Sequence, residues 1–290
     1  MFFHGNAENS CTHPKFFYHL LLNGFNLFTF DNIGHGSSSG IRGSIFKYSD
    51  YIDIANQLFI YFNSIIDQEK KDNIYKKNDR NKNKDEKDKK SYENQINWIV
   101  MGFSFGGLIA TDFSLNCEFS EVKNVILFSP WIMTHKRLIN NFTKLYLFAF
   151  HRFFNPKSLI NFKIQEEVLK MDTESYIFLN KNLTDNEEFL RIRKKDTRIF
   201  RVISKRRLAE IYKAQLRLIK KENKKNLKFY LFLPEKDIIV DSDSSEKLIR
   251  KFNGEIFYLK NSYHDFLDYF DDRWKDFIKN LNNCLTKIVK

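Results

Sequence analysis

The sequence predicts an α/β fold, in which helices cover both faces of a mostly parallel β-sheet and a helical cap is inserted. First, the strand-like segments are continuous apolar runs, which are typical of strands buried on both faces. Second, segments with helical spacing lie between these runs. Third, the interval from Pro130 to Leu227 has no convincing strand and far exceeds one crossover helix, so we expect the cap there.

The predicted domains follow from this pattern. Residues 1–130 and 227–290 form the core, and residues 131–226 form the cap. The chain has 290 residues, of which 42% are hydrophobic, and this is enough for a sizeable core. Residues 67–95 form a Lys- and Asn-rich insert with few side chains to bury, so we expect it to be a disordered surface loop.

The core elements are expected in a fixed order along the chain. A short buried strand and a turn lie in NLFTFDNIGHG, at residues 26–36. A helix follows over residues 48–66, with Ser49 or Asp50 as its N-cap. After the insert, residues 97–115 predict a strand, a sharp turn and a helix. The remaining strands lie in VKNVILFSP, LKFYLFLPEKD and GEIFYLKNSYHD.

The net charge of +12 leaves three interpretations open: a nucleic-acid partner, an anionic membrane surface or no specific partner. No zinc-finger spacing or RNA-recognition signature is present, so we expect no nucleic-acid partner. No apolar stretch is long enough to span a bilayer, and no signal peptide precedes the first motif. The three cysteines have neither disulfide nor metal spacing, which favours a reducing compartment and a cytoplasmic protein.

The motif GFSFGG, at residues 102–107, contains G-x-S-x-G with Ser104 at its centre. It directly follows an apolar strand and directly precedes a helix, a setting in which a strained turn lifts the serine above the sheet. Gly102 and Gly106 leave room for the strand and the helix to approach each other. The alternative is a glycine-rich turn with a buried serine, but the context favours Ser104 as a nucleophile.

A serine hydroxyl needs a base, and the base needs an orienting acid. In this architecture the chain order is serine, acid, histidine. Asp237 and His264 each come just beyond a predicted strand, where an open parallel sheet places its site. Asp241 and Asp243 are alternatives, but they lie further from the strand and are better placed to cap a helix. The other histidines precede Ser104 or lie in the predicted cap.

Five segments resemble, in order, α/β-hydrolases of the monoacylglycerol lipase and lysophospholipase group, which are also grouped with the serine aminopeptidase type. HGNAENS resembles the His-Gly oxyanion loop, and FDNIGHGSSSGIRG resembles the turn Asp-x-x-Gly-His-Gly-x-Ser-x-Gly. GFSFGG resembles the nucleophile elbow, with Phe103 where histidine is more usual. DIIVDSDSS and YHDFLDYFDDRW resemble the acid loop and the histidine helix. Within the cap the resemblance is faint.

This resemblance implies an α/β-hydrolase fold and a serine hydrolase that cleaves carboxylic esters through an acyl-enzyme. Ser104 attacks the ester carbonyl, His264 carries the proton, and Asp237 holds the imidazole. The backbone N–H groups of Asn6 and Phe105 hold the oxyanion. The resemblance implies no metal and no organic cofactor. His4, Asp31 and His35 are expected to be structural.

The implied substrate is a lipid-like ester, either a lysophospholipid or a monoacylglycerol. A thioesterase or a peptidase-type relative with the same triad is an alternative, and a non-catalytic hydrolase-like protein is another. Epoxide hydrolases and dehalogenases need an aspartate in place of Ser104. Residues 138–162 of the cap combine aromatic, aliphatic and basic side chains. They fit an acyl-pocket helix, an interfacial helix that gives peripheral contact with an anionic membrane, or an ordinary amphipathic helix.

The start of the chain departs from the family pattern. The family has strands before the oxyanion loop, whereas almost nothing precedes it here. We therefore expect an N-terminal truncation: either the start is misassigned, or the chain is a shortened variant with an exposed sheet edge. A targeting signal upstream of Met1 is compatible with this expectation. If the truncation disables the oxyanion loop, the protein would be the non-catalytic alternative.

Overall fold

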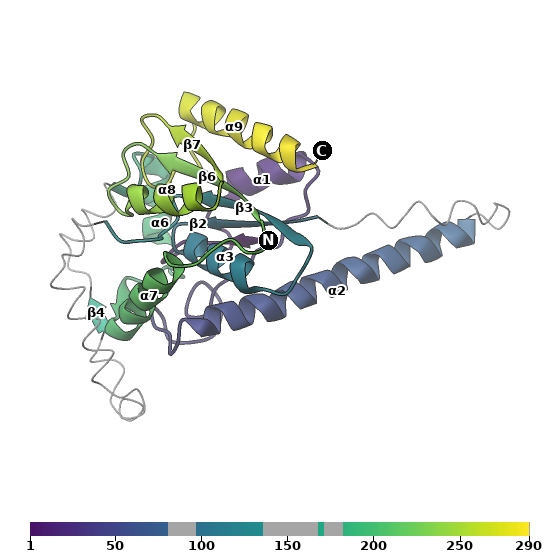
Figure 1. Ribbon diagram of the computed structural model, residues 1–290, viewed down its shortest axis with the longest axis horizontal. Coiled ribbons are helices and arrows are strands. Elements are labelled where there is room, and N and C mark those ends of the chain that lie inside the picture. Colours follow the sequence, from purple (N-terminus) through teal and green to yellow (C-terminus); the bar gives the residue numbers. More distant parts are fainter. Residues whose placement is uncertain (81–96, 136–167, 171–181, 290) are drawn as a thin grey trace.

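A computed structural model describes residues 1–80, 97–135, 168–170 and 182–289 (Figure 1). Its main sheet has five strands in the order β1-β2-β3-β6-β7, and all neighbours are parallel. The strands are β1 (Phe2–Phe3), β2 (Trp98–Phe103), β3 (Val122–Phe128), β6 (Lys228–Pro234) and β7 (Glu255–Leu259). The predicted fold class, a mostly parallel sheet flanked by helices, is confirmed.

Helices cover both faces of this sheet. On one face lie α1 (Pro14–Leu22) and α9 (Asp272–Val289), and the other face carries α2 (Ser49–Arg80), α3 (Phe105–Asn116) and α8 (Ser242–Lys251). Phe2 and Phe3 illustrate the division, because successive strand residues point to opposite faces. Phe2 packs with the cluster of α1 and α9, and Phe3 packs with the cluster of α2 and α3. Burial on both faces explains why the strands are continuous apolar runs.

The strand predicted within residues 26–36 is reduced to a single bridge, so this prediction is wrong in its extent. Thr29 bridges Phe2, and the Phe2 N–H donates to the Phe28 carbonyl at 2.9 Å. The physical reason is that β1 is only two residues long and offers few backbone groups for a partner. Phe28 and Phe30 are only partly buried, although both pack against the core.

Helix α2 begins at Ser49, one residue after the predicted start, so Ser49 and Asp50 are helical residues and not N-caps; the helix continues beyond residue 66 to Arg80. Residues 67–80 are therefore helical in the structure, and the prediction of a disordered loop is wrong for this part of the insert. Straight-chain polar residues form helices readily, and Gln68 donates to Asp72 at 2.9 Å across one turn. The distal half of α2 projects away from the sheet (Figure 1). Residues 81–95 of the insert lie outside the described residues.

The described part of the predicted cap contains α6 (Glu187–Lys195) and α7 (Lys205–Leu218), together with two short strands. The strands β4 (Val168–Lys170) and β5 (Val202–Ser204) pair antiparallel, whereas the sequence predicted helices alone. Three-residue strands carry too little pattern to be recognised in sequence. Residues 138–162 lie outside the described residues. Among the described helices, none is long and apolar enough to cross a membrane.

Candidate active site

Ser104 stands between β2 and α3 in a backbone conformation that few non-glycine residues adopt. Its φ is 51° and its ψ is −116°, and it is the residue that precedes the first turn of α3. The Ser104 N–H donates to the Phe128 carbonyl of the neighbouring strand at 2.9 Å, and the Trp131 N–H donates to the Ser104 carbonyl at 2.8 Å. These bonds hold the turn against a strain of about 1–3 kcal/mol.

The two glycines of the motif are required by close backbone contacts. A Cβ atom on Gly106 would lie 2.0 Å from the Phe3 carbonyl oxygen and 2.5 Å from that of His4. A Cβ atom on Gly102 would lie 2.4 Å from the Gly106 carbonyl oxygen. The start of α3 therefore packs directly on the end of β1, and only glycine allows this approach.

Of the three residues predicted as a triad, His264 lies within hydrogen-bond distance of both Ser104 and Asp237. His264 Nε2 is 2.9 Å from Ser104 Oγ, and His264 Nδ1 is 2.7 Å from Asp237 Oδ2. Because a carboxylate only accepts, His264 Nδ1–H donates to Asp237, and Nε2 is left to accept the Ser104 hydroxyl proton. The other Asp237 oxygen accepts the N–H groups of Ile239 and Val240 at 2.8 and 3.1 Å, which fixes the carboxylate.

The environment of His264 sets its basicity. Burial alone would lower the pKa of His264, but the charge of Asp237 and its hydrogen bond outweigh burial and raise this pKa above the usual value. His264 and Asp237 follow β7 and β6, at the carboxyl edge of the sheet. Of the alternative acids, Asp241 accepts the Ser244 hydroxyl at 2.7 Å at the start of α8. It therefore belongs to that helix start.

The two predicted oxyanion donors occupy the ends of neighbouring elements. Asn6 lies in the loop after β1, and Phe105 is the first residue of α3. Among the described residues, neither backbone N–H donates to a backbone carbonyl. The partial positive charge of a helix N-terminus adds to the Phe105 N–H. The roles of Asn6 and Phe105 as oxyanion donors stay a prediction.

The loop after β1 is fastened by side chains on both sides. The Gly5 N–H donates to the Glu8 carboxylate at 2.7 Å. His4 Nδ1–H donates to the Gly5 carbonyl at 2.9 Å, and His4 Nε2 accepts the Asn32 N–H at 2.9 Å. Asp31 accepts the backbone N–H of Ser10 at 2.6 Å in the same region. These contacts agree with the structural roles expected for His4 and Asp31.

A buried ionic cluster beside the triad was missed by the sequence analysis. His13 Nδ1 is 2.7 Å from Asp268 Oδ2, and His13 Nε2 is 3.3 Å from Glu8 Oε2. Burial alone would lower the pKa of His13, but the charges of Asp265 and Glu8 and the hydrogen bonds of Asp268 and Glu8 raise it well above its usual value. The His13 ring also meets the Phe103 ring edge-on, with centroids 5.1 Å apart. Nothing in the spacing of HGNAENSCTH indicates this cluster.

Within the described residues, Glu8, His13 and Asp265 are the group that could hold a metal ion. Their ligand atoms lie within 4.8 Å of one another, and all three side chains are buried. However, both ring nitrogens of His13 already face carboxylates, so its imidazolium form supplies the positive charge that a metal would bring. We interpret the cluster as an ion network that joins the oxyanion loop to the loop of His264.

Arg207 is a second residue that the sequence analysis missed. It lies on α7, is fully buried, and donates from Nη1 to Asn6 Oδ1 at 2.6 Å. Its spacing to the buried residues Ile211, Ala214 and Leu218 places it on the apolar face of the helix. That arginine on an apolar stripe is the signal by which the sequence could have singled it out from the neighbouring basic residues.

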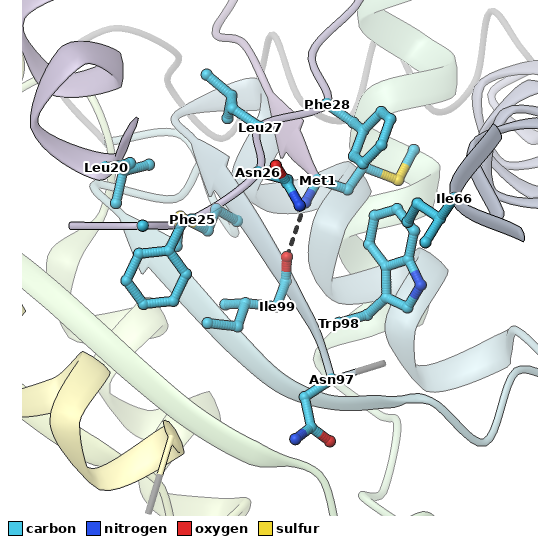
Figure 2. Close-up of a pocket in the computed structure, with 12 residues that line it drawn as sticks. Met1, Leu20, Phe25, Asn26, Leu27, Phe28, Ile66, Asn97, Trp98 and Ile99 are labelled. Atoms are coloured by element: carbon cyan, nitrogen blue, oxygen red, sulfur yellow. Dashed lines mark hydrogen bonds between the residues drawn. The ribbon is translucent and has the colours of Figure 1, made fainter. Parts of the chain in front are cut away.

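A cavity of about 170 Å³ lies elsewhere, at the amino ends of β1 and β2 (Figure 2). Figure 2 shows the Met1 amino group bonded to the Ile99 carbonyl, at 2.9 Å, with Leu20 and Ile66 on opposite sides. The whole length of β2 separates Ile99 from Ser104, about 16 Å at 3.3 Å per residue. This cavity therefore has no part in the candidate site.

Comparisons with known proteins agree with this architecture. The family model described as serine aminopeptidase, S33, matches residues 1–75 and 83–271. No protein with a curated description matches the chain in sequence.

Among solved structures, the monoacylglycerol lipase of Paleococcus ferrophilus is similar with a TM-score of 0.70 and 19% identity, over 99% of this chain and 93% of that chain. A soluble variant of the monoglyceride lipase of Saccharomyces cerevisiae, in complex with a substrate analog, has a TM-score of 0.74 and 18% identity, over 99% of this chain and 85% of that chain. A thermostable carboxyl esterase of Bacillus coagulans has a TM-score of 0.64 and 13% identity, over 100% of this chain and 89% of that chain. At these identities the structures show a shared fold, and the family match covers most of the sequence. The chain belongs to the serine aminopeptidase S33 family of α/β-hydrolases.

Proposed function

We propose that the protein is a serine hydrolase that cleaves carboxylic esters through Ser104, His264 and Asp237. The observation that carries this proposal is the continuous hydrogen-bond chain from Asp237 through His264 to Ser104. The strained backbone at Ser104 supports it. So do the backbone N–H groups of Asn6 and Phe105, which donate to no backbone carbonyl among the described residues. Family membership supports hydrolysis in general.

The first half of the proposed reaction forms an acyl-enzyme. Ser104 Oγ attacks the ester carbonyl carbon while its proton passes to His264 Nε2, and Asp237 stabilises the imidazolium. The N–H groups of Asn6 and Phe105 bind the negative carbonyl oxygen of the tetrahedral intermediate. When this intermediate collapses, the ester C–O bond breaks and the leaving alcohol takes the proton from His264.

The second half restores the enzyme. Water attacks the acyl carbon, His264 accepts its proton, and the same two N–H groups bind the second oxyanion. Collapse then releases the carboxylic acid and returns the proton to Ser104. Water is the second substrate, and every proton transfer in this sequence uses His264.

For the substrate we propose a lipid-like ester, namely a monoacylglycerol or a lysophospholipid. Two of the similar structures are a monoacylglycerol lipase and a monoglyceride lipase, and the latter holds a substrate analog. A thioester or a peptide could be opened by the same triad, and they are the competing substrates. The membrane contact predicted for residues 138–162 stays a prediction, and binding to anionic vesicles at low and high salt would test it.

A fluorophosphonate probe tests the proposed nucleophile, because it phosphonylates an activated serine. We expect the wild-type protein to be labelled and the Ser104→Ala variant to lose both labelling and ester hydrolysis, by at least about 10³-fold in kcat. Ser114→Ala is the matched control, since Ser114 is also a buried serine and its hydroxyl has no hydrogen-bond partner among the described residues. A well-folded wild-type protein that is never labelled would favour the non-catalytic alternative.

A substrate panel tests the proposed substrate class. We expect higher kcat/KM for monoacylglycerols and lysophospholipids than for acyl thioesters or for peptides with a free N-terminus. Equal or greater activity on a thioester would replace the lipid-ester proposal with the thioesterase alternative.

A further inference from the structure

We propose that Arg207, a residue of the predicted cap, is a positioning residue that orients the oxyanion loop and places a fixed positive charge beside it. This inference rests on the proposed function, because it concerns the same oxyanion. It also assigns a role to the side chain of Asn6, whose backbone N–H is the proposed donor.

Arg207 contacts both residues that carry the proposed oxyanion donors. Its Nη1–H donates to Asn6 Oδ1 at 2.6 Å, and its Cζ lies 4.7 Å from the centroid of the Phe105 ring. A hydrogen bond to the side chain of Asn6 limits rotation of this residue. The direction of the Asn6 N–H then depends on a residue 201 positions away in sequence.

The guanidinium is held from its other sides, so it forms a rigid support. Its Nε–H donates to the Tyr51 hydroxyl at 3.0 Å, and its Nη2 is 3.2 Å from His35 Nε2. His35 Nδ1–H donates to the Ile33 carbonyl at 3.1 Å, which leaves Nε2 as an acceptor for Arg207. Burial and the charge of Arg207 also keep the pKa of His35 well below its usual value, so His35 is a neutral acceptor.

Among the described residues, no carboxylate forms an ion pair with Arg207, and its hydrogen-bond partners are uncharged. These partners are an amide oxygen, a hydroxyl and a ring nitrogen. A buried cation without a counter-ion is costly, and arginine stays charged at every accessible pH. The negative charge that develops on the substrate carbonyl oxygen would be the group that compensates it. A preorganised charge of this kind stabilises a transition state more than a ground state.

The same loop is held by a second cap helix. Arg193 of α6 donates to the Ala7 carbonyl at 3.0 Å, and Asn9 donates to Asp196, which follows α6, at 2.9 Å. The loop of residues 6–9 is therefore bonded to both described cap helices. Of these contacts, the one from Arg207 reaches the proposed donor residue itself.

The test compares variants of Arg207 in ester hydrolysis and in the rate of fluorophosphonate labelling. For Arg207→Gln we expect kcat and the labelling rate to fall about 10- to 100-fold, with KM within about twofold of wild type, because a positioned oxyanion donor is worth about 10²–10³. Arg207→Lys keeps the charge but not the fork of donors, and we expect an intermediate loss. Arg206→Gln, one residue earlier on α7, is the matched control and should retain wild-type kcat.

Two further measurements separate positioning from a merely structural role. If Arg207 acts through Asn6, the double variant Asn6→Ala with Arg207→Gln should lose no more activity than the worse single variant. Added guanidinium at low millimolar concentration should partly restore labelling of Arg207→Ala, with an unchanged thermal midpoint.

Three outcomes would overturn the proposal. Wild-type kcat and labelling in Arg207→Gln would do so while leaving the proposed function intact. A parallel loss of kcat, substrate binding and thermal midpoint without guanidinium rescue would reduce Arg207 to a packing role. Absence of labelling in the wild-type protein itself would remove the proposed function, and this inference with it.

Discussion

At the scale of single residues, the protonation of His264 governs when the proposed triad can work. His264 must be neutral to accept the Ser104 proton, and its pKa is raised above the usual histidine value. We therefore expect kcat/KM to fall as the pH is lowered through a value above 6.5, the ordinary pKa of histidine. The pH profile of ester hydrolysis measures this limb.

Asp237→Asn sharpens the same prediction. Removal of the carboxylate charge removes the main contribution that raises the pKa of His264. The pH at which the remaining activity falls on the acid side should therefore be lower than in wild type. Asp241→Asn changes an aspartate that bonds Ser244 instead, and its profile should match wild type. An acid limb in wild type at or below pH 6.5 would contradict the assignment.

Phe103 is the residue-scale departure from the family pattern, and its surroundings account for it. Its ring lies between two buried imidazoles, with centroids 5.1 Å from His13 and 5.2 Å from His264. The polar contacts in this region are made instead by His13 and its carboxylate neighbours. The substitution therefore leaves the Ser104–His264 contact intact.

At the scale of elements, the packing of α3 on β1 leads to a stability prediction. Gly106→Ala would bring a Cβ atom to 2.0 Å from the Phe3 carbonyl oxygen, and neither backbone can yield without separating the helix from the strand. We expect a loss of about 3 kcal/mol in the free energy of unfolding, measured by urea denaturation. The contact also holds the oxyanion loop against Phe105, so activity should fall with stability.

Gly24→Ala is the control for that variant. Gly24 has a φ of +79° but no atom within 4 Å of an added Cβ, so the change costs only backbone strain of about 1 kcal/mol. An equal loss in both variants would mean that the approach of α3 to β1 contributes nothing specific.

Elements with strong patterns could be predicted from sequence, and weak ones could not. The strands β2, β3 and β6 are long, mostly buried apolar runs, and β7 is a partly buried apolar run at the sheet edge. Their existence and parallel pairing therefore followed from the sequence pattern. The strand predicted around Thr29 was wrong because its pairing depends on the length of β1, which no local sequence pattern indicates. The distal part of α2 was wrongly predicted as a loop because its polar residues are compatible with a helix or a loop.

The candidate site divides in the same way. Ser104, Asp237 and His264 each follow a predictable strand, and their residue types match one chemistry, so their proximity could be predicted. Arg207 and His13 could not be, because their contacts come from elements that the sequence does not place relative to the sheet. His13 contacts Asp268 across 255 positions, and Arg207 contacts Asn6 across 201.

At the scale of the whole molecule, α2 has two halves of unequal importance. Its first half packs Tyr51, Ala55, Phe59 and Phe62 into the core, whereas residues 67–70 are exposed. We expect Asp72→Pro to reduce the helical circular dichroism signal but to change the free energy of unfolding by less than about 0.5 kcal/mol. Gln57→Pro, at a position in the packed half that is also exposed, should cost about 3 kcal/mol. Equal losses would show that the distal half contributes to the fold.

The proposed site joins residues that lie far apart in the sequence, and this affects when the molecule can become active. The pair Ser104–His264 closes a separation of 160 residues, and the bond between Arg207 and Asn6 closes 201. Such distant contacts are entropically expensive to form, so they slow folding and complete late. During synthesis the oxyanion loop and Ser104 emerge long before His264. Under the proposed mechanism, the nascent chain is inert toward esters until His264 has emerged, and ester hydrolysis should appear only when these distant contacts form.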